Sequence, residues 1–350
     1  MFPPLQIGNV RIGHPVVQAA LSGYSDWAMR VLARRMGAPY TLCEVMLDQF
    51  LLGHSHFKKN QARIRVTDEE HPVGGQLMGA DPADFGPAAA RLVEIGFDII
   101  DINFGCPVKK ALGRCRGGYH LGQPAVALEI VDRVRAAVPP HIPVTLKMRR
   151  GLDDTPASRD KFYTILDGAF ARGAAAITVH GRTVRQGYIG PSRWEFLSEV
   201  KRHVGDRVIL GSGDLFTPQA CVEMLQQTGV NGVTAARGAI GNPWIFAQTR
   251  ALLAGEPLPP PPSTHEQKGV IDRHFDLAVE LYGGDIAGRL MRKFCIKYAR
   301  LHPAGVVVRD AFVAAKNITK MREVFDLYYT DDLPGRHPDA DEVDQVQECG

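Results

Sequence analysis

The feature that most constrains the fold of this chain is the alternation of short apolar runs with helical segments over roughly its first 250 residues. Eight runs have the length and β-branched composition of buried strands: Pro15–Ala20, Tyr40–Val45, Val73–Met78, Phe97–Asn103, Val144–Met148, Ala176–His180, Val208–Gly211 and Gly232–Ala235. Helix-start signals precede three intervening segments, at Ser25–Trp27 before Ala28–Arg35, Asp81–Pro82 before Ala83–Ile95, and Thr217–Pro218 before Gln219–Gln227. This order predicts a (β/α)₈ TIM barrel, with a doubly wound parallel sheet as the alternative.

Polar and glycine-rich residues follow the predicted strands, where a barrel would carry its chemistry. They are Gln76, Asn103–Cys106, Lys147–Arg149, His180–Arg182, Gly211–Asp214 and Ala236–Gly238. Convergence of these residue types on one rim would form a site for an anionic, planar ligand. The turn Gly105-Cys106-Pro107 is the most informative of them, because it presents one thiol at the end of a buried strand. The alternative is that Cys106 is a small buried hydrophobic residue.

The chain divides into four parts by composition. Residues 1–254 form the predicted barrel domain, and the proline-rich residues 255–264 are a semi-rigid linker. Residues 265–330 are helical in pattern, and the acidic residues 331–350 are expected to lack fixed structure. Along Ala287–Leu301, a basic ridge is predicted to face outward while Leu290, Phe294 and Tyr298 form the apolar face; the ridge is Arg289, Lys293, Lys297 and Arg300.

Composition narrows the class of protein. The six cysteines show no CxxC pair and no Cys/His cluster at zinc spacing, so neither a disulfide framework nor a metal site is expected. We expect a cytoplasmic protein with no membrane segment, because the N-terminus lacks a signal-peptide pattern and no apolar run is long enough to span a bilayer. The formal charge is +3, although residues 331–350 hold seven acids against one arginine. The rest of the chain is therefore more basic, which favours polyanionic partners.

With these segments in place, the chain resembles the tRNA-dihydrouridine synthases, and most closely the bacterial B type. The matching segments, in order, are Asp101–Lys110, Val144–Arg149, Thr178–Thr183 with Gln186–Tyr188, Gly213–Asp214, Arg237 and Gly241–Phe246. The resemblance covers about Leu5 to Tyr329. It implies a flavin-binding barrel followed by a helical tRNA-binding domain, a monomer, and reduction of a uridine C5=C6 bond by FMN, which NADPH reduces.

The resemblance also implies roles for individual residues. Cys106 would protonate C5 of the uracil, a task that suits a thiol with an ordinary pKa of about 8.5, and Cys115 is the less favoured alternative acid. Asn103 would orient the uracil with both a donor and an acceptor. Lys147, Gln76 and His180 would contact the flavin ring. The remaining positions would contact the flavin or its phosphate, namely Ala20, Leu21, Ser212, Gly213, Asp214, Ala236 and Arg237. Phosphates of flavin or RNA would meet Arg149 and Arg182, and tRNA would meet Arg289, Arg292, Lys293 and Lys297.

Four segments depart from the family pattern. Ala19–Leu21 replaces Ala-Pro-Met, Ser212–Gly213 replaces Asn-Gly, Ala236–Arg237 replaces Gly-Arg, and Gly117–Leu121 replaces Gly-Ser-Ala-Leu-Leu. Ala236 would be strained if that position required a positive φ. Tyr119 and His120 either reshape the uridine pocket or pack beneath it. Two other functions therefore stay open: an FMN barrel acting on a small pyrimidine, and a paralogue that has lost flavin and binds RNA.

Overall fold

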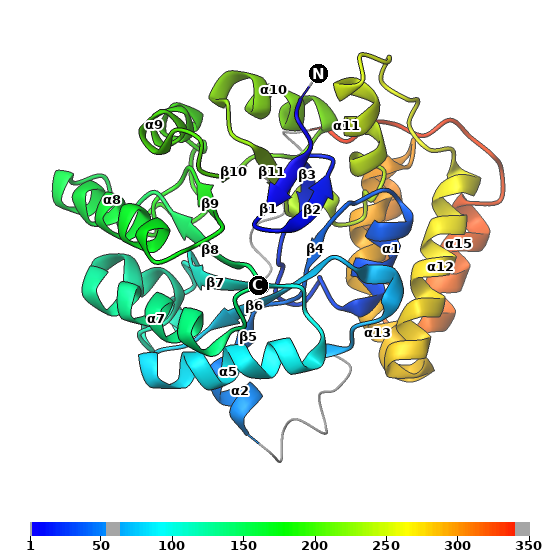
Figure 1. The fold of residues 1–350 in the computed structure, drawn as a ribbon. Coiled ribbons are helices and arrows are strands. Elements are labelled where there is room, and N and C mark those ends of the chain that lie inside the picture. Colours follow the sequence, from blue (N-terminus) through cyan, green and yellow to red (C-terminus); the bar gives the residue numbers. More distant parts are fainter. Residues whose placement is uncertain (1, 54–63, 340–350) are drawn as a thin grey trace.

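The computed structural model describes residues 2–53 and 64–339. Within these ranges, eight parallel strands form a closed barrel (Figure 1): β3 (Val16–Gln18), β4 (Thr41–Leu42), β6 (Val73–Met78), β7 (Ile99–Phe104), β8 (Val144–Arg149), β9 (Ala176–His180), β10 (Ile209–Ser212) and β11 (Gly232–Ala235). The barrel closes because β3 pairs with both β4 and β11, and β4 pairs with β6. The predicted TIM barrel is confirmed, and the doubly wound sheet is excluded. A further short strand, β5 (Met46–Leu47), pairs with β6.

Helices surround the barrel, and three of them begin where the sequence signals indicate. The surrounding helices are α1 (Trp27–Arg35), α2 (Asp48–Leu52), α5 (Pro82–Ile95), α6 (Lys109–Leu112), α7 (Pro124–Ala137), α8 (Pro156–Ala171), α9 (Trp194–Val204), α10 (Pro218–Thr228) and α11 (Ile245–Leu253). The side chain of Asp26 accepts a hydrogen bond from the first turn of α1, and Asp81 and Thr217 do the same for α5 and α10. These caps explain why three helix starts could be predicted to within one residue.

An N-terminal hairpin, which the sequence analysis did not predict, covers one end of the barrel. It consists of β1 (Leu5–Ile7) and β2 (Val10–Gly13). Its buried side chains form a separate cluster with residues near the starts of the strands, among them Tyr40, Ile99 and Leu210. The amino ends of the strands are therefore closed by apolar packing, and the carboxyl ends remain to form a site.

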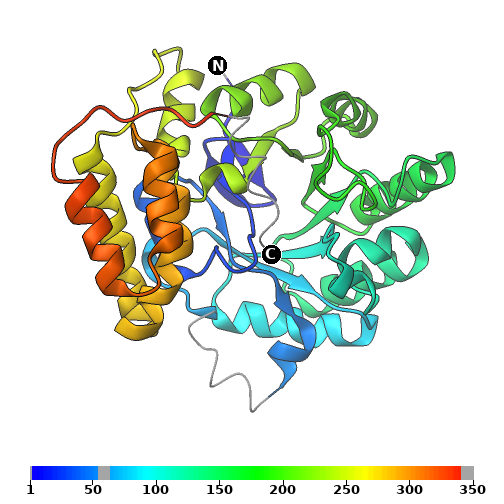
Figure 2. The ribbon, with the colours of Figure 1, turned by 180° about the vertical axis from the view of Figure 1, so that it is seen from behind.

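Four helices follow the linker: α12 (Thr264–Tyr282), α13 (Gly284–Tyr298), α14 (Gly305–Ala314) and α15 (Ile318–Tyr328). Ser263 and Glu266 form a reciprocal capping box at the start of α12. Figures 1 and 2 show these helices side by side on one flank of the barrel, next to α1. Among the described helices, none combines the length and the apolar character needed to cross a membrane.

Part of the acidic tail has a defined structure, which corrects the expectation for residues 331–339. The backbone N–H of Thr264 donates to the carbonyl of Leu333 at 3.0 Å, and the backbone N–H of Arg336 donates to the carbonyl of Leu301 at 2.9 Å. The Thr264 hydroxyl also donates to the carbonyl of Asp331. Composition alone could not show these contacts, because in each of them the segment or its partner contributes a backbone group. The rest of the predicted tail, 340–350, lies outside the described residues.

Candidate active site

A cavity of about 450 Å³ lies at the carboxyl ends of the barrel strands. All ten positions predicted to contact flavin line it: Ala20, Leu21, Gln76, Lys147, His180, Ser212, Gly213, Asp214, Ala236 and Arg237. Cys106, Asn103 and Arg149 line it too, and the helical region contributes Lys297 and Arg300. The cavity does not reach four of the residues predicted to contact tRNA, namely Arg182, Arg289, Arg292 and Lys293.

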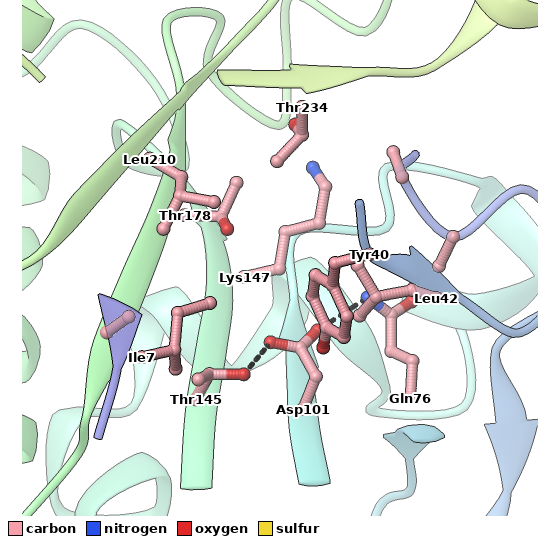
Figure 3. A pocket seen from close by; sticks show the side chains of 13 residues that line it. Ile7, Tyr40, Leu42, Gln76, Asp101, Thr145, Lys147, Thr178, Leu210 and Thr234 are labelled. Carbon is pink, nitrogen blue, oxygen red and sulfur yellow. Dashed lines mark hydrogen bonds between the residues drawn. The ribbon is translucent and has the colours of Figure 1, made fainter. Parts of the chain in front are cut away.

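A second cavity, of about 20 Å³, lies within the barrel and shares lining residues with the first. Figure 3 shows its polar side: Asp101 lies between Thr145 and Gln76, accepting a hydrogen bond from each, and Lys147 lies beside them. Barrel interiors are commonly filled by branched apolar side chains. In this barrel, by contrast, the layer of Gln76, Asp101 and Thr145 is polar. It lies directly under the candidate site, since Gln76 lines both cavities.

Cys106 lies on a turn that is held on both sides. The side-chain oxygen of Asn103 accepts hydrogen bonds from the backbone N–H groups of Gly105 and Cys106, each at 3.0 Å. The carbonyl of Cys106 accepts from Gly118 at 3.1 Å. A Cβ at Gly117, where φ is +59°, would lie 2.7 Å from Cβ of Cys106. The side-chain amide of Asn103 and the closely packed Gly117 and Gly118 therefore fix the turn that places the Cys106 thiol at the cavity wall.

The amide of Asn103 differs from the expectation that it offers both a donor and an acceptor to a ligand. Its oxygen is occupied by two backbone N–H groups, and its nitrogen donates to Oε1 of Gln76 at 2.8 Å. The second N–H of this nitrogen is the group that Asn103 retains for the cavity. A ligand edge that meets Asn103 must therefore present an acceptor, such as a carbonyl oxygen.

Lys147 and His180 give the cavity wall a cation and a neutral donor. Burial, with the nearby cation of Arg149, lowers the pKa of Lys147 to about 8, and among the described residues its ammonium group donates no hydrogen bond. Burial and the surrounding cations hold the pKa of His180 well below its ordinary value. Nδ1 of His180 accepts from the backbone N–H of Arg182 at 3.1 Å, so the proton of the neutral ring is on Nε2.

Arg149 and Arg182 bind the protein itself. Arg149 donates to the carbonyls of Gly105, Thr183 and Gly187 at 3.0, 2.8 and 2.6 Å, and burial lowers its pKa to about 10. Arg182 is 1% exposed and forms an ion pair with Asp214 at 2.7 Å. The guanidinium of Arg182 is thus buried and engaged within the protein, and its contact with a phosphate of flavin or RNA stays a prediction. Arg149 ties the Cys106 turn to the loop after β9.

The loops after β10 and β11 hold the residues for which a phosphate contact was predicted. Gly213 has φ +121°, and a Cβ there would lie 2.2 Å from Oγ of Ser192, so this position requires glycine. Asp214, at φ +60°, follows it. Ala236 has φ −107°, so alanine is accommodated there, and the expected strain does not arise. The Arg237 guanidinium lies over Phe216, 4.8 Å from the ring centroid.

The positions of Tyr119 and His120 show how the loop after Cys106 departs from the family pattern. His120 is buried, donates from Nε2 to the carbonyl of Gly79 at 3.0 Å, and contacts the ring of Phe104. Burial lowers the pKa of His120, which favours the neutral ring, and the hydrogen bond to the Gly79 carbonyl places the ring proton on Nε2. Tyr119 is 38% exposed and does not line the cavity. His120 therefore packs beneath the loop.

Helix α13 turns part of its basic ridge toward the barrel, which corrects the predicted outward ridge. Lys293 donates to the carbonyl of Gly23, and Arg300 donates to the carbonyls of Gly238 and Ile240 at 2.9 and 2.6 Å. Arg292 donates to the carbonyl of Phe312, at the end of α14, at 3.2 Å. Arg289 is exposed. Phe294 and Tyr298 are buried as predicted, whereas Leu290 is half-buried.

Two aromatic residues of the cavity wall were not predicted. The guanidinium of Arg237 lies between Tyr188 and Phe216, 5.3 Å and 4.8 Å from their ring centroids. Both aromatic side chains line the cavity. Each lies in a loop that follows a predicted strand, and an aromatic residue there is the signal that could have indicated them. They hold Arg237 at the site by cation–π contact.

The closed barrel, with its thiol, cations and amides at the carboxyl ends of the strands, defines a TIM-barrel enzyme. The family model for dihydrouridine synthase (Dus) matches residues 17–330. The chain belongs to the dihydrouridine synthase family.

Individual relatives agree with this assignment. The chain is 34% identical over 330 residues to a probable tRNA-dihydrouridine synthase of Mycobacterium tuberculosis, covering 91% of this chain and 83% of the relative. It is 33% identical over 309 residues to tRNA-dihydrouridine synthase B of Pseudomonas aeruginosa, covering 88% and 90%. Among solved structures, morphinone reductase in complex with tetrahydroNAD shares the fold, with a TM-score of 0.52, 14% identity, and coverage of 74% of this chain and 92% of that chain.

Proposed function

We propose that the chain is an FMN-dependent tRNA-dihydrouridine synthase, which reduces the C5=C6 bond of a uridine in tRNA with NADPH as reductant and Cys106 as the proton donor to C5. The observation that carries this proposal is the Cys106 thiol, held by Asn103 on a glycine-tight turn at the wall of a cavity rich in cations. Family membership supports uridine in tRNA as the substrate.

The residues at the cavity fit a flavin mononucleotide. Burial is the largest cause of the lowered pKa of His180, and four neighbouring cations, Lys147, Arg149, Arg182 and Arg237, lower it further, so positive charge surrounds the place where an anionic ligand would lie. We assign Lys147, Gln76 and His180 to the ring edge, since a cation there stabilises negative charge on a reduced ring. The glycine-dependent turn at Gly213 and the cation of Arg237 would hold the phosphate. Ala20 and Leu21 complete the wall.

When bound, FMN reduced by NADPH would supply a hydride to C6 of the uracil. The chain's own part is to place the base and deliver a proton. The remaining N–H of Asn103 donates to a carbonyl oxygen of the base. The S–H bond of Cys106 breaks as a C–H bond forms at C5, and the resulting thiolate then regains a proton from water. Hydride and proton together account for the two hydrogens that the C5=C6 bond gains.

The helical region supports a macromolecular substrate. Lys297 and Arg300 line the same cavity as Cys106, although they lie about 190 residues later in the chain. A site for a small pyrimidine has no need of cations from a second layer of structure, whereas a nucleotide within RNA brings phosphates to the mouth of the cavity.

The test begins with the purified protein. We expect a flavin absorption spectrum that bleaches when NADPH is added without oxygen, and dihydrouridine in tRNA that previously lacked it. A reduced flavin with turnover of free pyrimidine and none of tRNA would favour the small-molecule barrel. A colourless protein that binds tRNA but neither FMN nor NADPH would favour the paralogue without flavin, and either result would contradict the proposal.

A further inference from the structure

A buried chain of hydrogen bonds links Asp101 to the backbone of Cys106. Oδ2 of Asp101 accepts from Nε2 of Gln76 at 2.7 Å, and Oε1 of Gln76 accepts from Nδ2 of Asn103 at 2.8 Å. Oδ1 of Asn103 then accepts from the N–H groups of Gly105 and Cys106 at 3.0 Å. The three side chains are 3%, 1% and 8% exposed, so water does not substitute for these bonds.

The two ends of this chain fix the direction of every bond between them. Backbone N–H groups can only donate, so they require the oxygen of Asn103 to face the turn. Its nitrogen must then donate to Gln76, whose own nitrogen must donate onward. Asp101 ends the chain as an acceptor, and its other oxygen accepts from the Thr145 hydroxyl at 2.6 Å. Rotating either amide would bring two N–H groups, or two oxygens, face to face.

We propose that Asp101 is a positioning residue for Cys106: as the terminal acceptor, it fixes the orientation of Gln76 and, together with the backbone N–H groups at the other end, that of Asn103, which holds the Gly105–Cys106 turn with its oxygen and offers the cavity a donor. Its link to activity rests on the proposed function, but the hydrogen-bond chain itself does not. Asp101 acts through Gln76 and Asn103, since it does not line the larger cavity.

The direction of these hydrogen bonds predicts which substitutions can be tolerated together. In Asn103→Asp, Gln76 lies between two carboxylates, those of residues 101 and 103. Its nitrogen can donate to one of them only if its oxygen then faces the other. Adding Asp101→Asn supplies a donor at the far end, and the whole chain can then run in the opposite direction. Asp101→Asn alone is tolerated as well, because its amide nitrogen can face Thr145, whose hydroxyl is able to accept.

The experiment compares the double variant Asp101→Asn/Asn103→Asp with Asn103→Asp alone. The first readout is hydrogen–deuterium exchange in a peptide covering Phe104–Val108, and the second is the alkylation rate of Cys106. We expect Asn103→Asp to speed exchange by about tenfold, the effect of one lost buried hydrogen bond, and Asp101→Asn to return it close to the wild-type rate.

A matched control separates this rescue from simple relief of charge repulsion. Asp101→Leu removes the same negative charge but supplies no donor, so exchange in Asp101→Leu/Asn103→Asp should stay fast. If that variant does not fold, Asp101→Ala in the same background serves the same purpose. The proposal is overturned if the apolar residue rescues as well as asparagine does, or if Asn103→Asp leaves the turn as protected as in the wild type.

Activity provides a separate readout. Asp101→Asn should retain dihydrouridine formation, and Asp101→Leu should lose at least about tenfold in turnover while keeping its flavin spectrum. Equal turnover in the two variants would contradict the positioning role. Because exchange and alkylation need neither flavin nor tRNA, they report on Asp101 even if the proposed function fails.

Discussion

Arg182 and Asp214 form an ion pair between the loops after β9 and β10, with 2.7 Å between Nη1 and Oδ1. The second carboxylate oxygen accepts from Nη2 of Arg182 at 3.0 Å and from the backbone N–H of Ser192 at 2.7 Å. These bonds hold Asp214 at φ +60°, beside the proposed phosphate site. A residue first expected to bind an external phosphate thus shapes the loop that would bind it.

Removing this carboxylate should destabilise the protein. Asp214→Ala leaves a guanidinium that is 1% exposed without its partner, so we expect the free energy of unfolding to fall by about 1–3 kcal/mol, with weaker flavin binding. Asp214→Asn should cost less, because it keeps one acceptor. Arg193→Ala is the control: it breaks an exposed ion pair with Asp154, worth about 0.5 kcal/mol or less. Urea unfolding measures all three, and equal effects would contradict the buried role.

Cys106 and Cys115 make a matched pair of substitutions. Cys106 lines the cavity and is half-buried, whereas Cys115 is exposed in the following loop and does not line it. Cys106→Ala should keep its flavin and lose dihydrouridine formation by about 10²-fold or more, since general acid catalysis contributes that much. Cys115→Ala should retain turnover. Rates from single-turnover assays with tRNA decide the matter, and the reverse pattern would make Cys115 the acid.

Lys147 should lower the stability of the flavin-free protein at neutral pH. Its pKa falls from 10.5 to about 8 on folding, so the folded chain releases this proton first as pH rises. Between pH 8 and 10.5 the unfolded chain binds more protons than the folded chain, so the unfolding free energy of the wild type increases with pH. Lys147→Met removes the penalty, so it should be the more stable protein at pH 7, with the difference shrinking between pH 8 and 10.5.

Urea titrations of both proteins at pH 7 and at pH 10 test this directly, because other alkaline effects cancel in the difference. A difference that does not change with pH would contradict the burial of the cation. The same substitution should weaken flavin binding, so stability and ligand affinity are expected to move in opposite directions.

Lys297 should contribute to tRNA binding separately from its neighbours on α13. Arg292 and Lys293 donate hydrogen bonds to backbone carbonyls within the protein. Replacing them together with Lys297 would therefore combine lost internal contacts with lost phosphate contacts. Lys297→Ala should weaken tRNA binding and reduce the slope of log affinity against log salt by about one. Filter binding at several salt concentrations measures both, with Lys320→Ala, paired to Glu323 on α15, as the control. An unchanged slope would remove Lys297 from the interface.

Gly241 should be required for docking of α13. It has φ +67°, and a Cβ there would lie 2.5 Å from the backbone of Lys297 and Tyr298. Gly241→Ala should therefore cost roughly 3 kcal/mol or more of unfolding free energy. Gly255→Ala is the matched control, since it also has a positive φ, +80°, but meets no atom within 4 Å, so it should cost only about 1–2 kcal/mol. Similar losses would show that α13 does not press on Gly241.

The barrel could be predicted from the sequence because each of its units carries a local signal. Strands such as Val73–Met78 read as apolar runs, and Asp81 and Thr217 mark helix starts through their own hydrogen bonds. The positions of cavity residues followed, since strand ends converge in a closed barrel. The hairpin of Leu5–Gly13 escaped prediction because its apolar residues alternate with polar ones, such as Gln6 and Arg11, and do not form the continuous apolar runs that marked the barrel strands.

The features that could not be predicted are the directions in which side chains point and the groups with which they pair, rather than their positions along the elements. Periodicity shows that Lys293 and Lys297 share a helix face, but it does not show whether that face meets solvent or the barrel. An asparagine at position 103 can both donate and accept hydrogen bonds. Only the structure shows that the backbone N–H groups of Gly105 and Cys106 already occupy its oxygen. The pairing of Arg182 with Asp214 likewise shows only in the structure.

The contact between Gly241 and α13 also bears on how such a chain can evolve. A barrel that accepts another helical region in place of this one would have to keep a residue without a side chain at this point, or lose the close approach of the two backbones. The same approach brings Lys297 to the cavity wall. Exchange of the helical region would therefore change the residues that line the site itself.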